Sequence, residues 1–102
     1  MAQPHILIVD DEAFFRKLYC GILADEGYRV DACDNGEVAI ARMQSEPIDL
    51  VLTDMVMPGR DGLQVLEASR SLENPPDVIL VTGHASLENV ISLKEFKNAI
   101  NS

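Results

Sequence analysis

The chain has 102 residues, 47% of them hydrophobic, and its 17 acidic and 8 basic residues give a net charge of −9. This size fits one globular domain, and the acidic balance argues against binding to nucleic acid or to anionic membranes, which need a basic surface. No apolar run is long enough to span a bilayer, and the first four residues show no sign of a secretory signal.

Two cysteines, Cys20 and Cys33, stand alone in the sequence. Neither belongs to a C-x-x-C pair or to a metal-binding spacing. We therefore expect both to be small buried residues in a reducing compartment, which makes the cytoplasm the expected location.

The first half of the chain shows two strand patterns and two helix patterns. Residues 5–10, an apolar run closed by acids, predict a strand, with His5 at a solvent-facing start. A helix is expected from about residue 13 until Gly27 stops it. Residues 28–33 alternate and predict a second, more exposed strand, and residues 36–45 predict a second helix. The core side chains of the first helix are expected to include Phe14, Phe15, Leu18 and Ile22.

The second half repeats the alternation. The nearly continuous apolar run 48–52 is typical of a buried parallel strand and leads to Asp54 at its C-terminal tip. A third helix is expected to about residue 72, a fourth strand over 77–82, and a fourth helix from about Ser86. This alternation predicts a parallel sheet covered on both faces, with all C-terminal strand ends at one edge.

Acidic and polar residues gather at that common edge. Asp10 and Asp11 follow the first strand, Asp54 ends the third, and Thr82 ends the fourth. If the first and third strands are neighbours, their tips lie about 5 Å apart. Carboxylates that close repel one another unless one keeps its proton or a cation neutralises them. Oxygen ligands suit Mg²⁺, and a carboxylate beside Mg²⁺ is able to attack a phosphoryl group.

Three segments together resemble the receiver domain of two-component response regulators. They are residues 6–12, Asp54 with residues 57–62, and residues 81–84. The resemblance covers roughly residues 5–95 and implies a flavodoxin-like, doubly wound α/β sheet of strand order 2-1-3-4-5. Residues 1–102 are thus identified as one receiver domain, with four strands and four helices in this chain.

The resemblance also implies roles for single residues. Asp54 would accept a phosphoryl group from a phosphohistidine of a sensor histidine kinase or a phosphotransfer protein. Asp11, Asp54 and the backbone carbonyl of Val56 would hold Mg²⁺, with Asp10 beside them. Thr82 would contact the phosphoryl group and turn inward, which shifts the surface of the domain.

The chain departs from the family near its C-terminal end. The family's fifth strand, which carries a Lys-Pro pair, and its fifth helix have no counterpart, so we expect an incomplete receiver domain. Arg60 is the candidate to replace the missing lysine, and His84 is a candidate to influence hydrolysis of the acyl phosphate. The edge of the fourth strand, 78–81, would be exposed, which favours a homodimer through it.

Three functions compete on this evidence. The leading one is a phosphoacceptor signalling domain with no catalytic turnover of its own. The second is a degenerate receiver that no longer switches and serves as a binding or dimerisation module. The third is an aspartate-based phosphotransferase or phosphatase. It is disfavoured because such enzymes need a general acid two residues after the nucleophile, where this chain has Val56.

Overall fold

The computed structural model describes residues 3–55, 57, 59 and 61–81 of the chain. Within them the strands are β1 (His5–Val9), β2 (Arg29–Cys33), β3 (Leu50–Asp54) and β4 (Asp77–Val81), and the helices are α1 (Ala13–Asp25), α2 (Gly36–Ser45) and α3 (Gly62–Arg70). The fourth helix expected from Ser86 lies outside the described residues. None of the described helices is long and apolar enough to cross a bilayer.

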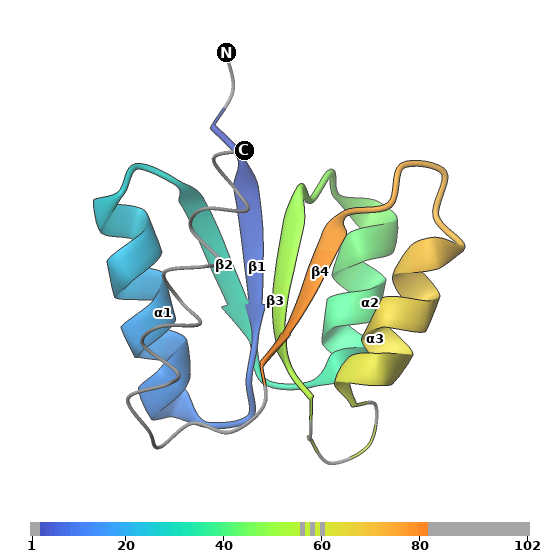
Figure 1. Ribbon diagram of the computed structural model, residues 1–102, viewed down its shortest axis with the longest axis horizontal. Coiled ribbons are helices and arrows are strands. Elements are labelled where there is room, and N and C mark those ends of the chain that lie inside the picture. The colour runs from blue at the N-terminus through green and yellow to red at the C-terminus, as the bar shows by residue number, and fades with distance from the viewer. Residues whose placement is uncertain (1–2, 56, 58, 60, 82–102) are drawn as a thin grey trace.

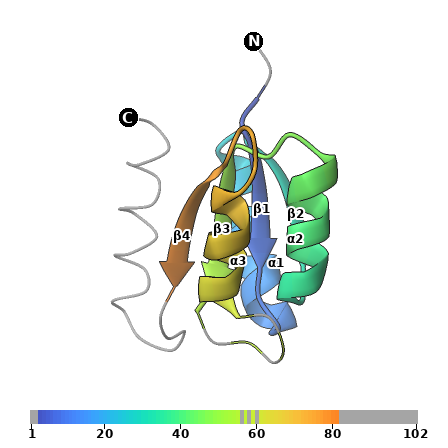
Figure 2. The same ribbon diagram turned by 90° about the vertical axis from the view of Figure 1, so that its right-hand side faces the viewer.

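All four strands are parallel and form one sheet in the order β2-β1-β3-β4, as expected for a flavodoxin-like fold. Helix α1 covers one face of the sheet, and α2 and α3 cover the other (Figures 1 and 2). The C-terminal ends of the strands meet at a single edge, the lower one in Figure 1. The predicted fold class and alternation are therefore confirmed.

Local sequence signals place the helix ends close to their expected positions. Gly27 follows α1 with a φ of 91°, a conformation that costs glycine little. The side chain of Asn35 accepts a hydrogen bond from the N–H of Val38 at 2.9 Å and so begins α2. Helix α3 ends two residues earlier than expected, since Ser71 forms its C-cap.

The core consists of two layers, one on each face of the sheet. Ile6 and Ile8 pack toward α1, whereas Leu7 and Val9 pack toward α2 and α3, because successive strand side chains point to opposite faces. All five residues of β1 are buried, while β2 is partly exposed. The expectation that the second strand is the more exposed one is confirmed.

The prediction for the core of α1 was wrong in part. Phe14 is 68% exposed and Leu18 is 42% exposed, while Phe15 and Ile22 are half-buried. The helix is oriented by the fully buried Leu23. Phe14 stands nine residues earlier, and at about 100° per residue this places it on the opposite side of the helix. Some apolar residues of α1 therefore lie outside the side of the helix that contacts the sheet.

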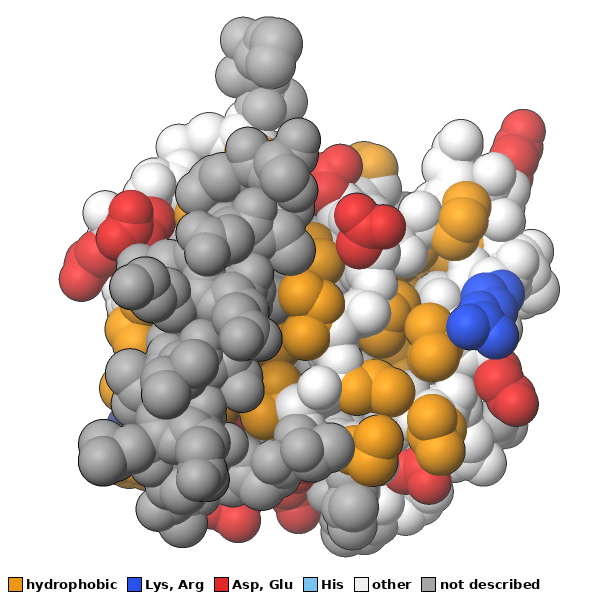
Figure 3. Space-filling view, viewed as in Figure 1, with side chains coloured by type: hydrophobic (Ala, Val, Ile, Leu, Met, Phe, Trp, Pro, Cys, Tyr) orange, Lys and Arg blue, Asp and Glu red, His pale blue; other side chains and the backbone are white. Residues whose placement is uncertain are grey.

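Strand β4 pairs with β3 and lies at an edge of the sheet among the described strands. Its residues Val78 to Val81 are half-buried. Hydrophobic side chains gather over β4 and α3 on the face seen in Figure 3. Leu63, in α3, is 50% exposed. The homodimer expected through this edge stays a prediction.

The prediction that His5 faces solvent was wrong, since this residue is 3% exposed. Its ring nitrogen Nε2 donates a hydrogen bond to the carboxylate of Asp31 at 2.6 Å, and Nδ1 lies 3.2 Å from the carbonyl oxygen of Pro47. The backbone N–H of His5 donates to the carboxylate of Asp49 at 2.7 Å. The residue is buried because β2 and the connection between α2 and β3 supply polar partners, which the sequence pattern does not reveal.

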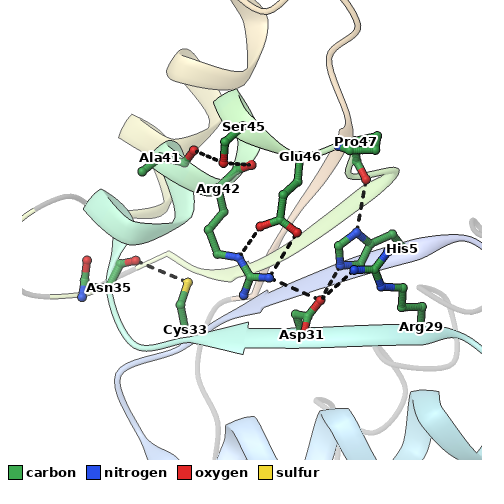
Figure 4. A network of polar contacts seen from close by, with 10 residues as sticks. All are labelled: His5, Arg29, Asp31, Cys33, Asn35, Ala41, Arg42, Ser45, Glu46 and Pro47. Carbon is green, nitrogen blue, oxygen red and sulfur yellow. Dashed lines mark hydrogen bonds and ion pairs between the residues drawn. The ribbon is translucent and has the colours of Figure 1, made fainter.

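The contact with His5 belongs to a larger polar network at the N-terminal end of the strands (Figure 4). The guanidinium of Arg42 lies 3.3 Å from the Asp31 carboxylate and donates to Glu46 at 2.9 Å. The hydrogen bond from His5, helped by the charges of Arg42, His5 and Arg29, holds the pKa of Asp31 below its usual range. This network ties β1, β2 and α2 together.

We expect Asp31→Asn to destabilise the protein by about 1 kcal/mol at neutral pH, a value reduced for the partial exposure of this carboxylate. Because the pKa of Asp31 is lowered on folding, its stabilising effect is present above the ordinary pKa of about 4 and is lost as the pH falls through the folded value. Urea unfolding of the unaltered protein and of Asp31→Asn over a pH series measures the difference in their free energies of unfolding.

The matched control is Asp25→Asn, since Asp25 is exposed and makes no polar side-chain contact among the described residues. This variant should show a smaller change in the free energy of unfolding, with little dependence on pH. An equal cost for Asp31→Asn well below pH 4 and at neutral pH would contradict the role given to its charge.

Candidate functional site

Three carboxylates converge at the C-terminal edge of the sheet, as the sequence predicted. Asp10, Asp11 and Asp54 each place an oxygen within 4.8 Å of the others. The cause is the pairing of β1 with β3, in which Val9 lies opposite Thr53, so the residues that follow emerge side by side. Segments more than forty residues apart in the sequence thus build one acidic cluster.

The members of this cluster differ in exposure. Asp10 is 2% exposed and Asp54 is 7% exposed, whereas Asp11 lies at the surface. The N–H of Asp10 donates to the carbonyl of Cys33 at 3.2 Å, and its carboxylate accepts from the N–H of Glu12 at 2.9 Å. The cluster therefore has a buried floor, and Asp11 forms its solvent-facing side.

Arg16 supports the turn that carries the cluster. Its guanidinium donates a hydrogen bond to the backbone carbonyl of Asp10 at 2.7 Å. The sequence analysis did not single out Arg16. No pattern of residue types reveals it, because the acceptor is a backbone atom that only the bend between β1 and α1 brings within reach.

The loop after Asp54 returns tightly to begin α3. Gly59 has a φ of 77°, and the N–H of Gly62 donates to the carbonyl of Met55 at 3.1 Å. Asp61, expected to serve the turn, forms a capping box with Gln64: its carboxylate accepts from the Gln64 N–H at 3.1 Å, and its own N–H donates to the Gln64 side chain at 2.9 Å. These contacts fix the backbone just beyond Asp54.

Position 62 requires glycine because the loop backbone there passes very close to the backbone of Asp54 and Met55. A Cβ atom built there would lie 2.6 Å from the carbonyl oxygen of Asp54 and 2.9 Å from the Cα of Met55. Both neighbours are backbone atoms, so any side chain at position 62 must displace the strand end that carries Asp54.

The donor set of the cluster fits a hard divalent cation. Three carboxylates offer only oxygen atoms, and Mg²⁺ is bound through one or two carboxylates while it keeps several waters. The exposed position of Asp11 leaves one side of the cluster open to such waters. The other predicted site residues, Val56, Arg60, Thr82 and His84, lie outside the described residues, and their roles stay predictions.

Tyr19 is a second residue near this site that the sequence analysis did not single out. It is 4% exposed and packs on the α1 face of the sheet with Ile8 and Leu52. Burial, followed by the negative charges of Asp10 and Asp54, raises the pKa of its phenol. Its spacing was an available signal, since Tyr19 stands four residues before Leu23 and belongs to the same buried stripe.

Comparisons with known proteins agree with this geometry. The family model described as the response regulator receiver domain matches residues 6–98. The chain is 41% identical over 87 residues to the sensor histidine kinase GacS of Pseudomonas protegens, covering 80% of this chain and 10% of that protein. It is 35% identical over 95 residues to sporulation initiation phosphotransferase F of Bacillus subtilis, covering 93% of this chain and 77% of that protein.

A solved structure shows the same likeness. The response regulator protein TrrA of Thermotoga maritima, crystallised in complex with Mg²⁺-BeF, superposes with a TM-score of 0.82 at 31% sequence identity, and 97% of each chain is covered. The chain spans about a tenth of the length of GacS. It spans about a third of the length of another relative, the transcriptional regulatory protein ResD of Bacillus subtilis. It therefore corresponds to a module within those longer proteins.

We expect Gly62→Ala to destabilise the protein by about 2 kcal/mol, because the added methyl group overlaps the backbone of Asp54 and Met55. Urea unfolding measures this loss. Gly21→Ala is the matched control: Gly21 lies inside α1, where a Cβ atom would meet nothing within 4 Å, and alanine there should stabilise the helix by about 0.5 kcal/mol. Equal effects of the two substitutions would contradict the close approach at Gly62.

Proposed function

Because the chain belongs to the family of response regulator receiver domains, we propose that Asp54 is its phosphoryl acceptor. The observation that carries this proposal is the convergence of Asp10 and Asp11 on Asp54 at the C-terminal edge of the sheet. Of the buried carboxylates in this cluster, Asp54 is the last residue of β3, one of the two interior strands of the described sheet. All five residues of this strand, Asp54 included, are buried, which holds its backbone in a defined position.

In the proposed reaction a carboxylate oxygen of Asp54 attacks the phosphorus atom of a phosphohistidine. The new O–P bond forms as the P–N bond of the donor breaks, and its electron pair returns to the imidazole. Mg²⁺ supplies compensation for the charge on the transferring group. Asp11 and Asp54 would hold this ion together with the carbonyl of Val56, and Asp10 would stand beside them. Thr82 hydrogen-bonds a phosphoryl oxygen and couples phosphorylation to the surface.

The donor in this proposal is a sensor histidine kinase or a phosphotransfer protein. Relatives with those names support it, since GacS is a sensor histidine kinase and the Bacillus protein is named a phosphotransferase. The domain itself acts as an acceptor and relay rather than as an enzyme with its own turnover. A cytoplasmic location is part of the same proposal, because the free thiols Cys20 and Cys33 suit a reducing compartment.

The interpretation of the chain as a degenerate receiver is not supported. All three acidic residues of the cluster are present and face one another. The matched family and its relatives are phosphoacceptor domains of signalling proteins. Arg60 and His84 remain candidates for auxiliary roles around the acyl phosphate, and the β4 edge remains the candidate surface for a homodimer.

We expect the protein to gain the mass of one phosphoryl group when it is incubated with Mg²⁺ and a small acyl phosphate, because Asp54 is positioned to attack phosphorus. Intact-protein mass spectrometry measures this change. Asp54→Asn should show none, while Asp34→Asn, which alters an acid at the start of the α2 turn, should be modified like the unaltered protein. Modification of Asp54→Asn to the same extent would overturn the assignment.

Mg²⁺ should also stabilise the fold, because it binds the native cluster and not the unfolded chain. At a concentration a hundred times the dissociation constant, the gain is about 2.7 kcal/mol. Thermal unfolding with and without Mg²⁺ measures it. Asp11→Asn should lose most of the gain, whereas Glu12→Gln should keep it, since Glu12 lies next in sequence but outside the cluster. Equal gains in the two variants would count against Asp11 as a ligand.

A further inference from the structure

Tyr19 is a buried residue whose hydroxyl group makes no hydrogen bond to any of the described residues. Tyr19 is 4% exposed, and among the described residues its side chain makes a stacked contact with Phe15, at a centroid distance of 6.2 Å, but no hydrogen bond. Leaving such a group unpaired in a protein interior is unfavourable. Buried polar groups nearly always have a partner, so an unpaired one points to a ligand or a state that supplies it.

The direction from which a partner comes follows from the register of the sheet. Ile8 and Leu52 pack in the same cluster as Tyr19, on the α1 face. Because strand side chains alternate, Asp10 and Asp54, each two residues further along, are on that face as well. The same two carboxylates act electrostatically on the phenol of Tyr19. Tyr19 therefore packs on the face of the sheet to which the register assigns Asp10 and Asp54.

We infer that Tyr19 is a positioning residue for the divalent cation, donating a hydrogen bond from its hydroxyl to the carboxylate of Asp10 when the cation is bound. A carboxylate that coordinates a cation must adopt one orientation, and a hydrogen-bond donor behind it holds that orientation. The carboxylate of Asp10 already accepts a hydrogen bond from the N–H of Glu12, and Tyr19 would add a donor from the α1 face. Tyr19 acts through Asp10 and does not touch the reacting atoms.

This inference rests on the proposed function, and its test separates the two. Isothermal titration with Mg²⁺ alone is made on the unaltered protein, on Tyr19→Phe and on Tyr28→Phe. We expect Tyr19→Phe to bind Mg²⁺ about tenfold more weakly, yet to melt without Mg²⁺ at the same or a higher temperature, because it removes an unpaired buried hydroxyl. A residue with a merely structural role would change the melting temperature and leave the affinity unaltered.

Tyr28→Phe is the matched control. Tyr28 packs on the same hydrophobic cluster but precedes Arg29, which lies opposite His5 at the other end of the strands. Its Mg²⁺ affinity should equal that of the unaltered protein. If the unaltered protein bound no Mg²⁺, the proposed function would fail; if it bound Mg²⁺ and Tyr19→Phe bound equally well, only the present inference would fail.

A second measurement does not depend on the Tyr19 variant. The chain has two tyrosines and no tryptophan, so in Tyr28→Phe the tyrosine emission comes from Tyr19 alone. We expect Mg²⁺ to change this emission with the same midpoint as the calorimetric titration, because the hydroxyl gains a hydrogen bond. Emission that stays constant while Mg²⁺ binds would overturn the inference.

Discussion

The pairing of β1 with β3 is the interaction on which the rest of this structure depends. It places Asp10 and Asp54 side by side although both are buried and carry like charge. Two such charges about 5 Å apart repel by roughly 3 kcal/mol at an effective dielectric constant of 20. The backbone hydrogen bonds between the strands and the packing of their apolar side chains offset this repulsion. The closely spaced negative charges that repel one another also attract a cation, so this edge of the sheet is suited to bind one.

The two ends of the sheet deal with charge in opposite ways. At the N-terminal end, the carboxylates of Asp31 and Glu46 are paired with His5 and Arg42, so that the charges there are compensated within the protein. At the C-terminal end, the three carboxylates face one another. Arg16 donates a hydrogen bond to the backbone carbonyl of Asp10. One end of the sheet therefore pairs acids with basic side chains, and the other brings three acids together.

The loop between β3 and α3 shows how local structure serves this arrangement. The capping box of Asp61 and Gln64 begins α3, and the hydrogen bond from Gly62 to Met55 closes the loop against the strand end. Contacts so close to Asp54 restrict its backbone. In the proposed phosphoryl transfer to Asp54, a backbone that is already restricted would lower the entropic cost of the reaction, because the carboxylate must meet phosphorus along a defined line.

The sequence by itself determined the order of the elements, the parallel sheet and the acidic edge. Continuous apolar runs distinguish the buried strands 5–9 and 48–52, and acids follow both, so their convergence could be predicted once the strands were taken as neighbours. The end of the first helix could also be predicted from Gly27, because capping depends on local chemistry.

Only the tertiary structure decided the partners of single side chains. His5 is buried because segments far along the chain bring it Asp31 and a backbone carbonyl, and no local pattern contains that information. Phe14 is exposed because the rotation of α1 is set by its contact with the sheet. Tyr19 is buried against Ile8 and Leu52 for the same reason. Hydrophobic periodicity reports which residues are apolar, whereas the orientation of each helix depends on packing across the whole domain.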